Sequence, residues 1–169
     1  MDAIRYDLKT LNRQFQLASK QRTASANNLI ALLEQSFPGI RKCFDSPVRS
    51  DGTQKWVDFA HSFWHVDCVR KQPFPAFCER YRKWCKRHAY LFKLSNAEEV
   101  YALAKRAVVL TPKSKVVKVL VQEAANQLSS ISRSVEVYRA EMDRLAAMLP
   151  EYPVVMALSL IHISEPTRP

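Results

Sequence analysis

Residues 113–149 read KSKVVKVLVQEAANQLSSISRSVEVYRAEMDRLAAML and contain neither proline nor glycine. From Val117 to Leu149, apolar side chains recur at alternating spacings of four and three residues. This spacing places them on one stripe of an α-helix and is typical of coiled coils. We therefore predict a single helix of about 55 Å that ends at Pro150. Its stripe needs a partner, which is either the first segment of the chain folding back or a second copy of the chain.

If the partner is a second copy, the middle of the stripe forms the seam between two chains. The residues that we then expect to drive oligomerisation are Val121, Leu128, Ile131, Val135, Tyr138, Met142 and Leu145. The prediction is a homo-oligomer held together through the long helix.

The other candidate partner is the N-terminal segment, residues 1–37. Apolar side chains in it again follow spacings of three and four, although Arg22 and Ser25 interrupt the stripe. The pattern predicts a long amphipathic helix from about Ala3 to Ser36. Phe37-Pro38-Gly39 ends this helix, because proline and glycine both oppose its continuation.

Residues 38–94 are basic and rich in aromatic side chains. We expect a polar connection over 40–55, a short helix over 53–66 and, after breaks at Pro73 and Pro75, a helix to about His88. In the third segment, residues 95–150, Ser95 and Glu98 have the spacing of a capping box and predict the start of a helix that precedes the long one. No strand pattern competes, except over 154–156. The predicted fold is all-α and extended.

Composition limits the function more than it limits the fold. The 169 residues have a net charge of +10 and a pI of about 9.7, which favours nucleic acid or an anionic membrane surface as a partner. Only two glycines occur, which argues against a glycine-rich phosphate loop or a dinucleotide-binding fingerprint. No apolar run is long enough to span a bilayer, and the N-terminus does not resemble a signal peptide. We therefore expect free thiols at all four cysteines and a cytoplasmic location.

The excess positive charge is concentrated in residues 53–94, which hold nine basic and three acidic side chains. Most of it lies in the run Arg80-Tyr81-Arg82-Lys83-Trp84-Cys85-Lys86-Arg87-His88. Cations interleaved with aromatic rings suit nucleic acid, because the cations meet phosphates and the rings can stack on unpaired bases. The alternative is that Tyr81 and Trp84 face the core beneath a solvated basic face. The candidate nucleic-acid-binding residues are Arg80, Arg82, Lys83, Lys86 and Arg87.

The histidines and cysteines raise the possibility of a metal site. His61 and His65 share a helical face, and Cys68 follows closely, but the spacing matches no standard zinc site and there is no C-x-x-C pair. Buried structural thiols and histidines are the more frequent explanation, so we assign no metal ligand. We identify no catalytic residue either: no serine lies in a nucleophile-elbow context, and the aspartates show no spacing that would gather two metal ions.

Several short stretches, taken in order, indicate a family. They are Asn12-Arg13-Gln14-Phe15, Asn27-Asn28-Leu29-Ile30 with Phe37-Pro38-Gly39, Phe44-Asp45-Ser46-Pro47 through Trp56-Val57-Asp58-Phe59, Trp64-His65-Val66-Asp67-Cys68, Tyr81-Arg82-Lys83-Trp84-Cys85 and Leu149-Pro150-Glu151-Tyr152-Pro153-Val154-Val155-Met156. In this order they resemble the transposases of insertion sequence family 110, over residues 1 to about 157.

The resemblance implies a function in DNA transposition and recombination. Such transposases combine an RNase H-like domain, whose four acidic residues bind divalent metal, with a helical coiled-coil region and a C-terminal domain with a catalytic serine. They act as oligomers in the bacterial cytoplasm on DNA, guided by a structured RNA. This chain resembles the central part, in which residues 1–37 end the first domain or its linker and residues 151–157 begin the last domain. Neither the acidic tetrad nor the serine has a counterpart here, so the resemblance transfers no catalytic residue and implies no cofactor for this part.

Residues 158–169, beginning Leu158-Ser159-Leu160-Ile161-His162-Ile163, resemble a translated sequencing adapter rather than transposase sequence. We therefore expect an internal fragment of a transposase, inactive alone, with a non-native tail. Two alternatives remain open. One is a free-standing helical nucleic-acid-binding regulator, and the other is a coiled-coil adaptor whose charge serves only solubility.

Overall fold

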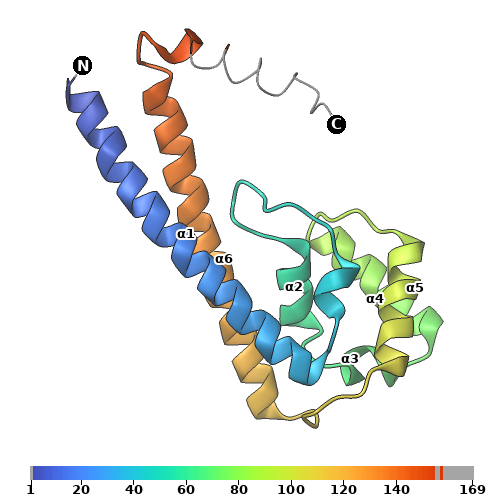
Figure 1. Ribbon diagram of the computed structural model, residues 1–169. Coiled ribbons are helices and arrows are strands. Elements are labelled where there is room, and N and C mark those ends of the chain that lie inside the picture. Colours follow the sequence, from blue (N-terminus) through green and yellow to red (C-terminus); the bar gives the residue numbers. More distant parts are fainter. Residues whose placement is uncertain (1, 155–156, 158–169) are drawn as a thin grey trace, which may run out of the picture.

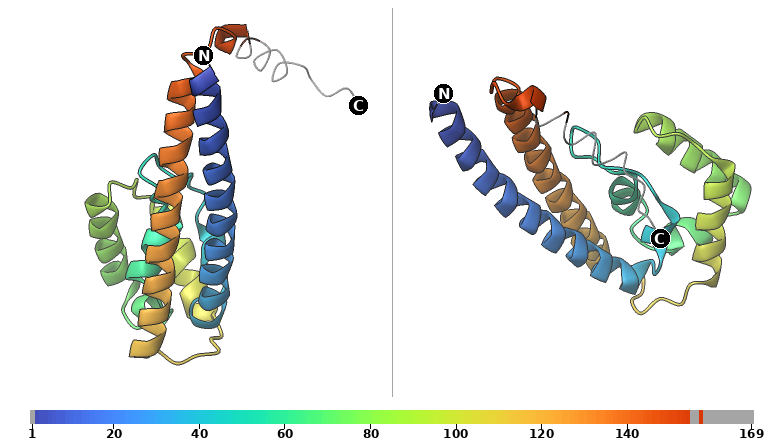
Figure 2. Two further views of the ribbon diagram at one scale, coloured as in Figure 1. Left: turned by 90° about the vertical axis from the view of Figure 1, so that its left-hand side faces the viewer. Right: turned by 45° about the horizontal axis from the view of Figure 1, so that its top comes forward.

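Two long antiparallel helices lie side by side and form an arm in the computed structural model, which describes residues 2–154 and 157 (Figures 1 and 2). They are α1, Asp2–Ser36, and α6, Lys115–Ala146. The partner of the long helix is thus the first segment of the same chain. The expected strand over 154–156 and the tail over 158–169 lie, apart from Val154, outside the described residues.

Contacts along the arm fix the antiparallel register. Arg5 forms an ion pair with Glu151, and the guanidinium of Arg139 lies 5.7 Å from the centre of the Phe15 ring. Nearer the other end, Arg22 Nη1 lies 3.7 Å from Glu136 Oε1. The interruption of the first stripe at Arg22 is therefore matched by an acidic residue on the facing helix. Ala18 of α1 is buried, and so small a side chain lets the two helices approach closely.

The remaining elements fold into a helical globule against one side of the arm (Figure 1). They are a 3₁₀ turn, η1, Ile40–Cys43, and four helices: α2, Lys55–Ser62; α3, Asp67–Arg70; α4, Phe74–Arg87; and α5, Leu94–Arg106. Its core is aromatic and is centred on Phe59, whose ring stacks on Phe63 at 4.5 Å between centroids. Further aromatic partners of Phe59 are Phe37, Phe44, Tyr81 and Trp84.

The described residues are therefore all-α, as predicted, and they contain no strand. None of the helices among them combines the length and apolar character needed to cross a bilayer. The four cysteines are free thiols, as predicted.

Several local predictions are wrong in detail. The capping box at Ser95 does not form: α5 begins at Leu94, its N-cap is Lys93, and no side chain caps it. The reason is tertiary, because the Asn96 side chain accepts a hydrogen bond from the Tyr81 hydroxyl and donates one to the Cys43 carbonyl, which fixes the first turn of α5.

The other differences concern the boundaries of elements. The connection over 40–55 is not uniformly polar, because Ile40 and Phe44 are buried in the core. The helix expected over 53–66 ends at Ser62, and α3 begins a separate turn at Asp67. Pro75 does not break the chain but occupies the first turn of α4, where proline is tolerated. The long helix has 32 residues rather than the 37 of the quoted stretch. It begins after Ser114, whose hydroxyl caps it by accepting the backbone N–H of Val117, and it ends at Ala146 instead of continuing to Pro150.

One glycine allows a turn of the chain to lie directly against the arm. Gly52 has φ +85°, and an added Cβ would lie 2.3 Å from the backbone nitrogen of Arg133 in α6. The turn over 49–53 thus rests directly on the backbone of the long helix, an approach that only glycine permits.

Candidate nucleic-acid interface

Helix α4 separates its aromatic and basic side chains onto opposite faces. Phe77, Tyr81, Trp84 and Cys85 are buried, and the rings of Tyr81 and Trp84 stack at 5.7 Å between centroids. The polar atoms of both rings are occupied, since the Tyr81 hydroxyl donates to Asn96 and Trp84 Nε1 donates to the Ser62 hydroxyl. These two rings therefore belong to the core, and stacking on unpaired bases is excluded for them.

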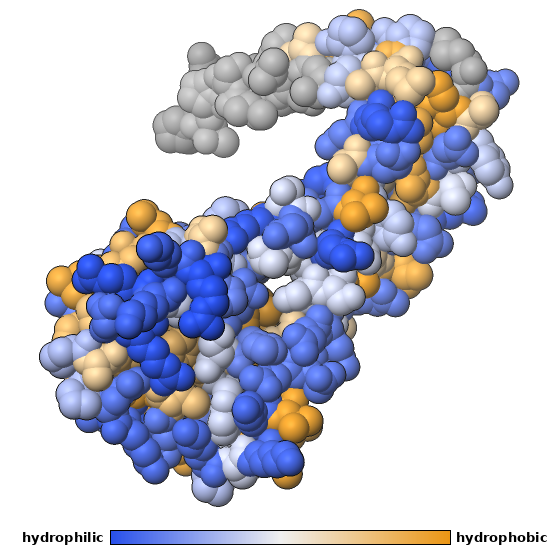
Figure 3. Space-filling view, turned by 180° about the vertical axis from the view of Figure 1, so that it is seen from behind, coloured by the Kyte–Doolittle hydropathy of each residue, from blue (hydrophilic) through white to orange (hydrophobic). Residues whose placement is uncertain are grey.

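The predicted binding residues of α4 are all exposed to solvent; they are Arg80, Arg82, Lys83, Lys86 and Arg87. In the view from behind, strongly hydrophilic side chains gather over the globule, to which α4 belongs (Figure 3). Glu79 on the same helix lies 3.9 Å from Arg82 and 3.8 Å from Lys83. Among the described residues, no acidic partner lies within ion-pair distance of Arg80, Lys86 or Arg87. The positive charge of this face is thus only partly neutralised.

Two of the arginines are held in place by the globule. Arg80 Nη1 donates to the Cys68 carbonyl at 3.0 Å, and its guanidinium lies 4.7 Å from the centre of the Phe63 ring. The Arg82 guanidinium lies 4.8 Å from the centre of the Phe92 ring. Because these contacts restrict the side chains, binding an anion there costs less conformational entropy than at a free surface arginine.

The residues predicted to drive oligomerisation are occupied within one chain. Val121, Leu128, Val135 and Leu145 are buried, and Ile131, Tyr138 and Met142 are half-buried. Helix α1 runs along the side of α6 that they form, and α2 packs against it as well. A second copy that used this seam would have to displace α1 or exchange it between chains.

The residues considered as metal ligands have structural roles. His65 is buried, and its Nε2 lies 3.0 Å from the Thr111 carbonyl while its Nδ1 accepts the backbone N–H of Asp67 at 3.1 Å. These two contacts define the neutral tautomer with the proton on Nε2. Cys68 is buried, and burial raises the pKa of its thiol. Over residues 2–154 no three His, Cys, Asp or Glu side chains gather in a group that could hold a metal ion, so the residues present do not fit the divalent metal of the resembled family.

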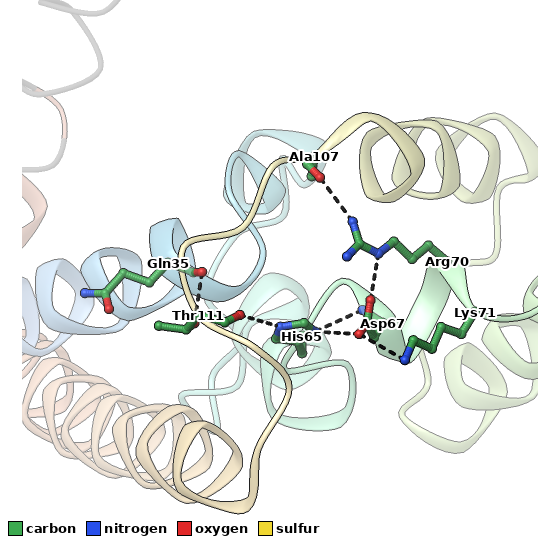
Figure 4. Close-up of polar contacts among 7 residues, drawn as sticks. All are labelled: Gln35, His65, Asp67, Arg70, Lys71, Ala107 and Thr111. Carbon is green, nitrogen blue, oxygen red and sulfur yellow. Dashed lines mark hydrogen bonds and ion pairs between the residues drawn. The ribbon is translucent and has the colours of Figure 1, made fainter.

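His65 is part of a polar network that ties three parts of the fold together (Figure 4). The Thr111 hydroxyl and backbone N–H both donate to the Gln35 carbonyl at the end of α1. Arg70 donates to Asp67 through Nε at 2.6 Å and to the Ala107 carbonyl through Nη1 at 3.1 Å. The segment over 107–114, which leads from α5 to α6, is thereby fixed to α1 and α3.

The charge of Asp67 is balanced inside this network. Burial alone would raise its pKa, but the hydrogen bond from Arg70 and the positive charges of Arg70 and Lys71 together lower the pKa of this carboxyl. Lys71 Nζ lies 3.4 Å from Asp67 Oδ2. The carboxylate therefore remains ionised at neutral pH and is already paired with two cations.

Beside this network lies a cleft of about 490 Å³, which sequence reasoning missed. Its lining comes from the end of α2, from α3, α4 and the start of α6 and includes Trp64, Asp67, Lys71, Arg80, Lys113 and Lys118. An adjoining hollow of about 650 Å³ shares Trp64, Lys113 and Lys118. The lysines before and within the first turns of α6 are the only sequence signal, but their closeness to Arg80 depends on the tertiary fold.

Comparison of the chain with protein-family models, with curated proteins and with solved structures finds no match. The functional interpretation therefore rests on the residues and on their geometry.

Proposed function

We propose that this chain is a nucleic-acid-binding helical module that takes part in DNA transposition. In this proposal it is the central part of a transposase of insertion sequence family 110, it contacts DNA and a structured guide RNA in the bacterial cytoplasm, and it binds rather than catalyses. The transposase assignment comes from the sequence resemblance, and the binding assignment comes from the geometry of α4.

The observation that supports binding most directly is the one-sided exposure of positive charge on α4. Arg80, Lys86 and Arg87 face solvent without an acidic partner among the described residues, above a rigid aromatic core. Cations in such positions repel one another, and polyanion binding relieves this repulsion. Contacts to phosphates confer affinity and orientation without reading the base sequence.

Salt-dependent binding to a fluorescent RNA hairpin and to a DNA duplex tests the proposal. The double variant Lys86→Gln/Arg87→Gln should weaken binding and reduce the slope of log K against log salt by about 0.9 for each lost contact with duplex DNA. The matched control is Lys9→Gln/Lys20→Gln, which removes the same charge from exposed positions of α1. Equal affinities and equal slopes for the two variants would contradict the proposal and favour the coiled-coil adaptor.

Self-association remains a second part of the proposal. The exposed apolar residues of α6, such as Val119 and Val137, are the positions still free to meet a second copy among the described residues. Light scattering on the wild-type chain tests the prediction directly. A monomer at all concentrations would remove it and leave the binding proposal unaffected.

A further inference from the structure

The cleft between α3, α4 and the start of α6 collects positive charge that no acidic side chain among the described residues neutralises. Arg80, Lys113 and Lys118 reach it from two distant parts of the sequence. Within the described residues none of these three cations lies within ion-pair distance of an acidic side chain. The one carboxylate in the lining, Asp67, is paired with Arg70 and Lys71. The cleft is therefore electropositive, and Arg80, Lys113 and Lys118 have no acidic partner among the residues that the structure describes.

The walls of the cleft are held in position before any ligand arrives. Arg80 is fixed by the Cys68 carbonyl and the Phe63 ring, as described above. Lys113 Nζ lies 5.5 Å from the centre of the Trp64 ring, and Gln122 Nε2 donates to the His61 carbonyl at 2.9 Å, which ties α6 to α2. The network around His65 fixes the segment that leads to Lys113 (Figure 4). Preorganised cations of this kind are typical of anion-binding sites.

The cleft also continues the basic face of α4. Arg80, Lys83 and Arg87 have the i, i+3, i+7 spacing that places side chains along one side of a helix. At 1.5 Å per residue this row is about 10 Å long. One strand of duplex DNA rises about 3.4 Å per nucleotide along the duplex axis, so a row of this length can face more than one phosphate of the same strand. Arg80, at one end of the row, lines the cleft.

We propose that this cleft binds a phosphate group of the nucleic-acid strand whose neighbouring phosphates lie along α4. The inference rests on the proposed function and adds to it a specific pocket, with Arg80, Lys113 and Lys118 as the phosphate ligands. Arg80 supplies a planar donor group, and the two lysines supply point charges. The pocket anchors the strand at one end of the basic row and thereby fixes its direction on the protein.

The test compares three double variants of the full chain that each remove two positive charges. They are Lys113→Gln/Lys118→Gln in the cleft, Lys86→Gln/Arg87→Gln on α4 and Lys9→Gln/Lys20→Gln on α1. All six lysines and arginines are exposed, so the variants should fold, and circular dichroism checks this. Binding to the RNA hairpin is measured by fluorescence anisotropy at several salt concentrations. Inorganic phosphate alone is titrated in parallel and followed by tryptophan fluorescence, because Trp64 lines the cleft.

We expect the cleft variant to weaken RNA binding at least fivefold relative to the α1 control and to abolish the fluorescence response to phosphate. If the cleft variant binds the RNA hairpin as tightly as the α1 control does, the inference is overturned. If in that case only the α4 variant loses affinity, the proposed function still holds. A loss confined to the cleft variant would mean that the strand does not continue along α4, and it would overturn both the inference as stated and the α4 surface of the proposed function. A phosphate response that disappears in the cleft variant without any change in RNA affinity would show a free-anion site and overturn the inference.

Discussion

The arm and the globule bury their apolar residues in different ways. The arm consists of two helices whose buried side chains outside the aromatic core are small or aliphatic, such as Ala18, Val135 and Leu145. The globule buries a cluster of aromatic rings around Phe59, with centroid distances of 4.5 to 6.2 Å. A two-helix seam encloses side chains on one side only, whereas the centre of the globule is enclosed on all sides. We infer that the globule contributes most of the free energy of folding.

This difference bears on function because the proposed binding surface lies on the globule. The aromatic face of helix α4 is buried in the core of the globule, and its cations lie on the opposite, exposed face. The arm has charged contacts that are mostly exposed, such as Arg5 with Glu151, and these contribute little to stability. Substitutions that weaken the globule should therefore reduce stability and binding together, and substitutions in the outer arm should leave both largely intact.

The largest effect is expected from Phe59→Ala. Phe59 is fully buried and contacts five other rings, so its removal leaves a cavity and should lower the free energy of unfolding by about 3–5 kcal/mol. The matched variant in the arm is Phe15→Ala, which removes a half-buried ring and should cost about 1–2 kcal/mol. Urea denaturation followed by circular dichroism measures both. Similar losses for the two phenylalanines would mean that the regions do not differ in stability.

The contact between the two regions is tested by Gly52→Ala. The new Cβ would collide with the α6 backbone at Arg133, and the residue would keep a positive φ, so we expect a loss of about 3 kcal/mol. Gly39→Ala is the control, because Gly39 also has a positive φ but its Cβ would meet only the Leu103 side chain, at 3.5 Å. It should cost about 1–2 kcal/mol. If the two variants lose the same stability, the turn does not rest on α6 as described.

The arm was more predictable from the sequence than the globule. Its helices were predicted from apolar side chains that recur every three and four residues. Arg22, which interrupts this pattern in α1, lies opposite Glu136 of α6 and forms an ion pair with it. The period does not specify the partner, because a second copy would satisfy the same stripe. The chain between α1 and α6 folds into the globule and so brings the two helices together. No local sequence pattern predicts that arrangement.

The globule depends on tertiary contacts that local rules miss. Ser95 has the spacing of a cap, yet the hydrogen bonds of Asn96 with Tyr81 and Cys43 set where α5 begins. The alternation of basic and aromatic residues in α4 identified an exposed basic face correctly. The cleft could not be predicted, because Arg80 and Lys113 are separated by 33 positions and line one cleft only in the folded chain.

A smaller effect, about 2 kcal/mol, is expected from His65→Ala. The variant leaves the Thr111 carbonyl and the Asp67 N–H without their partner in a buried site. The segment over 107–114 should loosen, so the amides of Leu110 and Thr111, which donate to the Gln35 carbonyl, should exchange hydrogen faster. His61→Ala is the control, because among the described residues the His61 ring makes no hydrogen bond. Its backbone carbonyl accepts one, and the substitution leaves that carbonyl in place. Equal exchange rates in both variants would show that His65 does not fix this segment.

The smallest effect concerns one thiol at the edge of the globule. Burial, together with the nearby charge of Glu99, raises the pKa of Cys43 to about 11 from an ordinary value of 9.0. Since only the thiolate reacts with iodoacetamide, labelling of Cys43 at pH 8 should be roughly a hundredfold slower than for a thiol of ordinary pKa. Between pH 9 and about 11 the unfolded state loses this proton first, so the contribution of Cys43 to stability falls as the pH rises.

Glu99→Gln separates the two causes. It removes the negative charge but not the burial, so the pKa of Cys43 should fall while remaining above its ordinary value. Mass spectrometry of the labelled Cys43 peptide across pH 8 to 11 follows the titration in both proteins. Because Glu99 lies on an exposed position of α5, the variant should retain its fold, so any change in labelling reports on the thiol itself. An unchanged labelling profile in Glu99→Gln would assign the whole shift of the Cys43 pKa to burial in the globule. A wild-type profile typical of an exposed thiol would show that this edge of the globule is open to solvent.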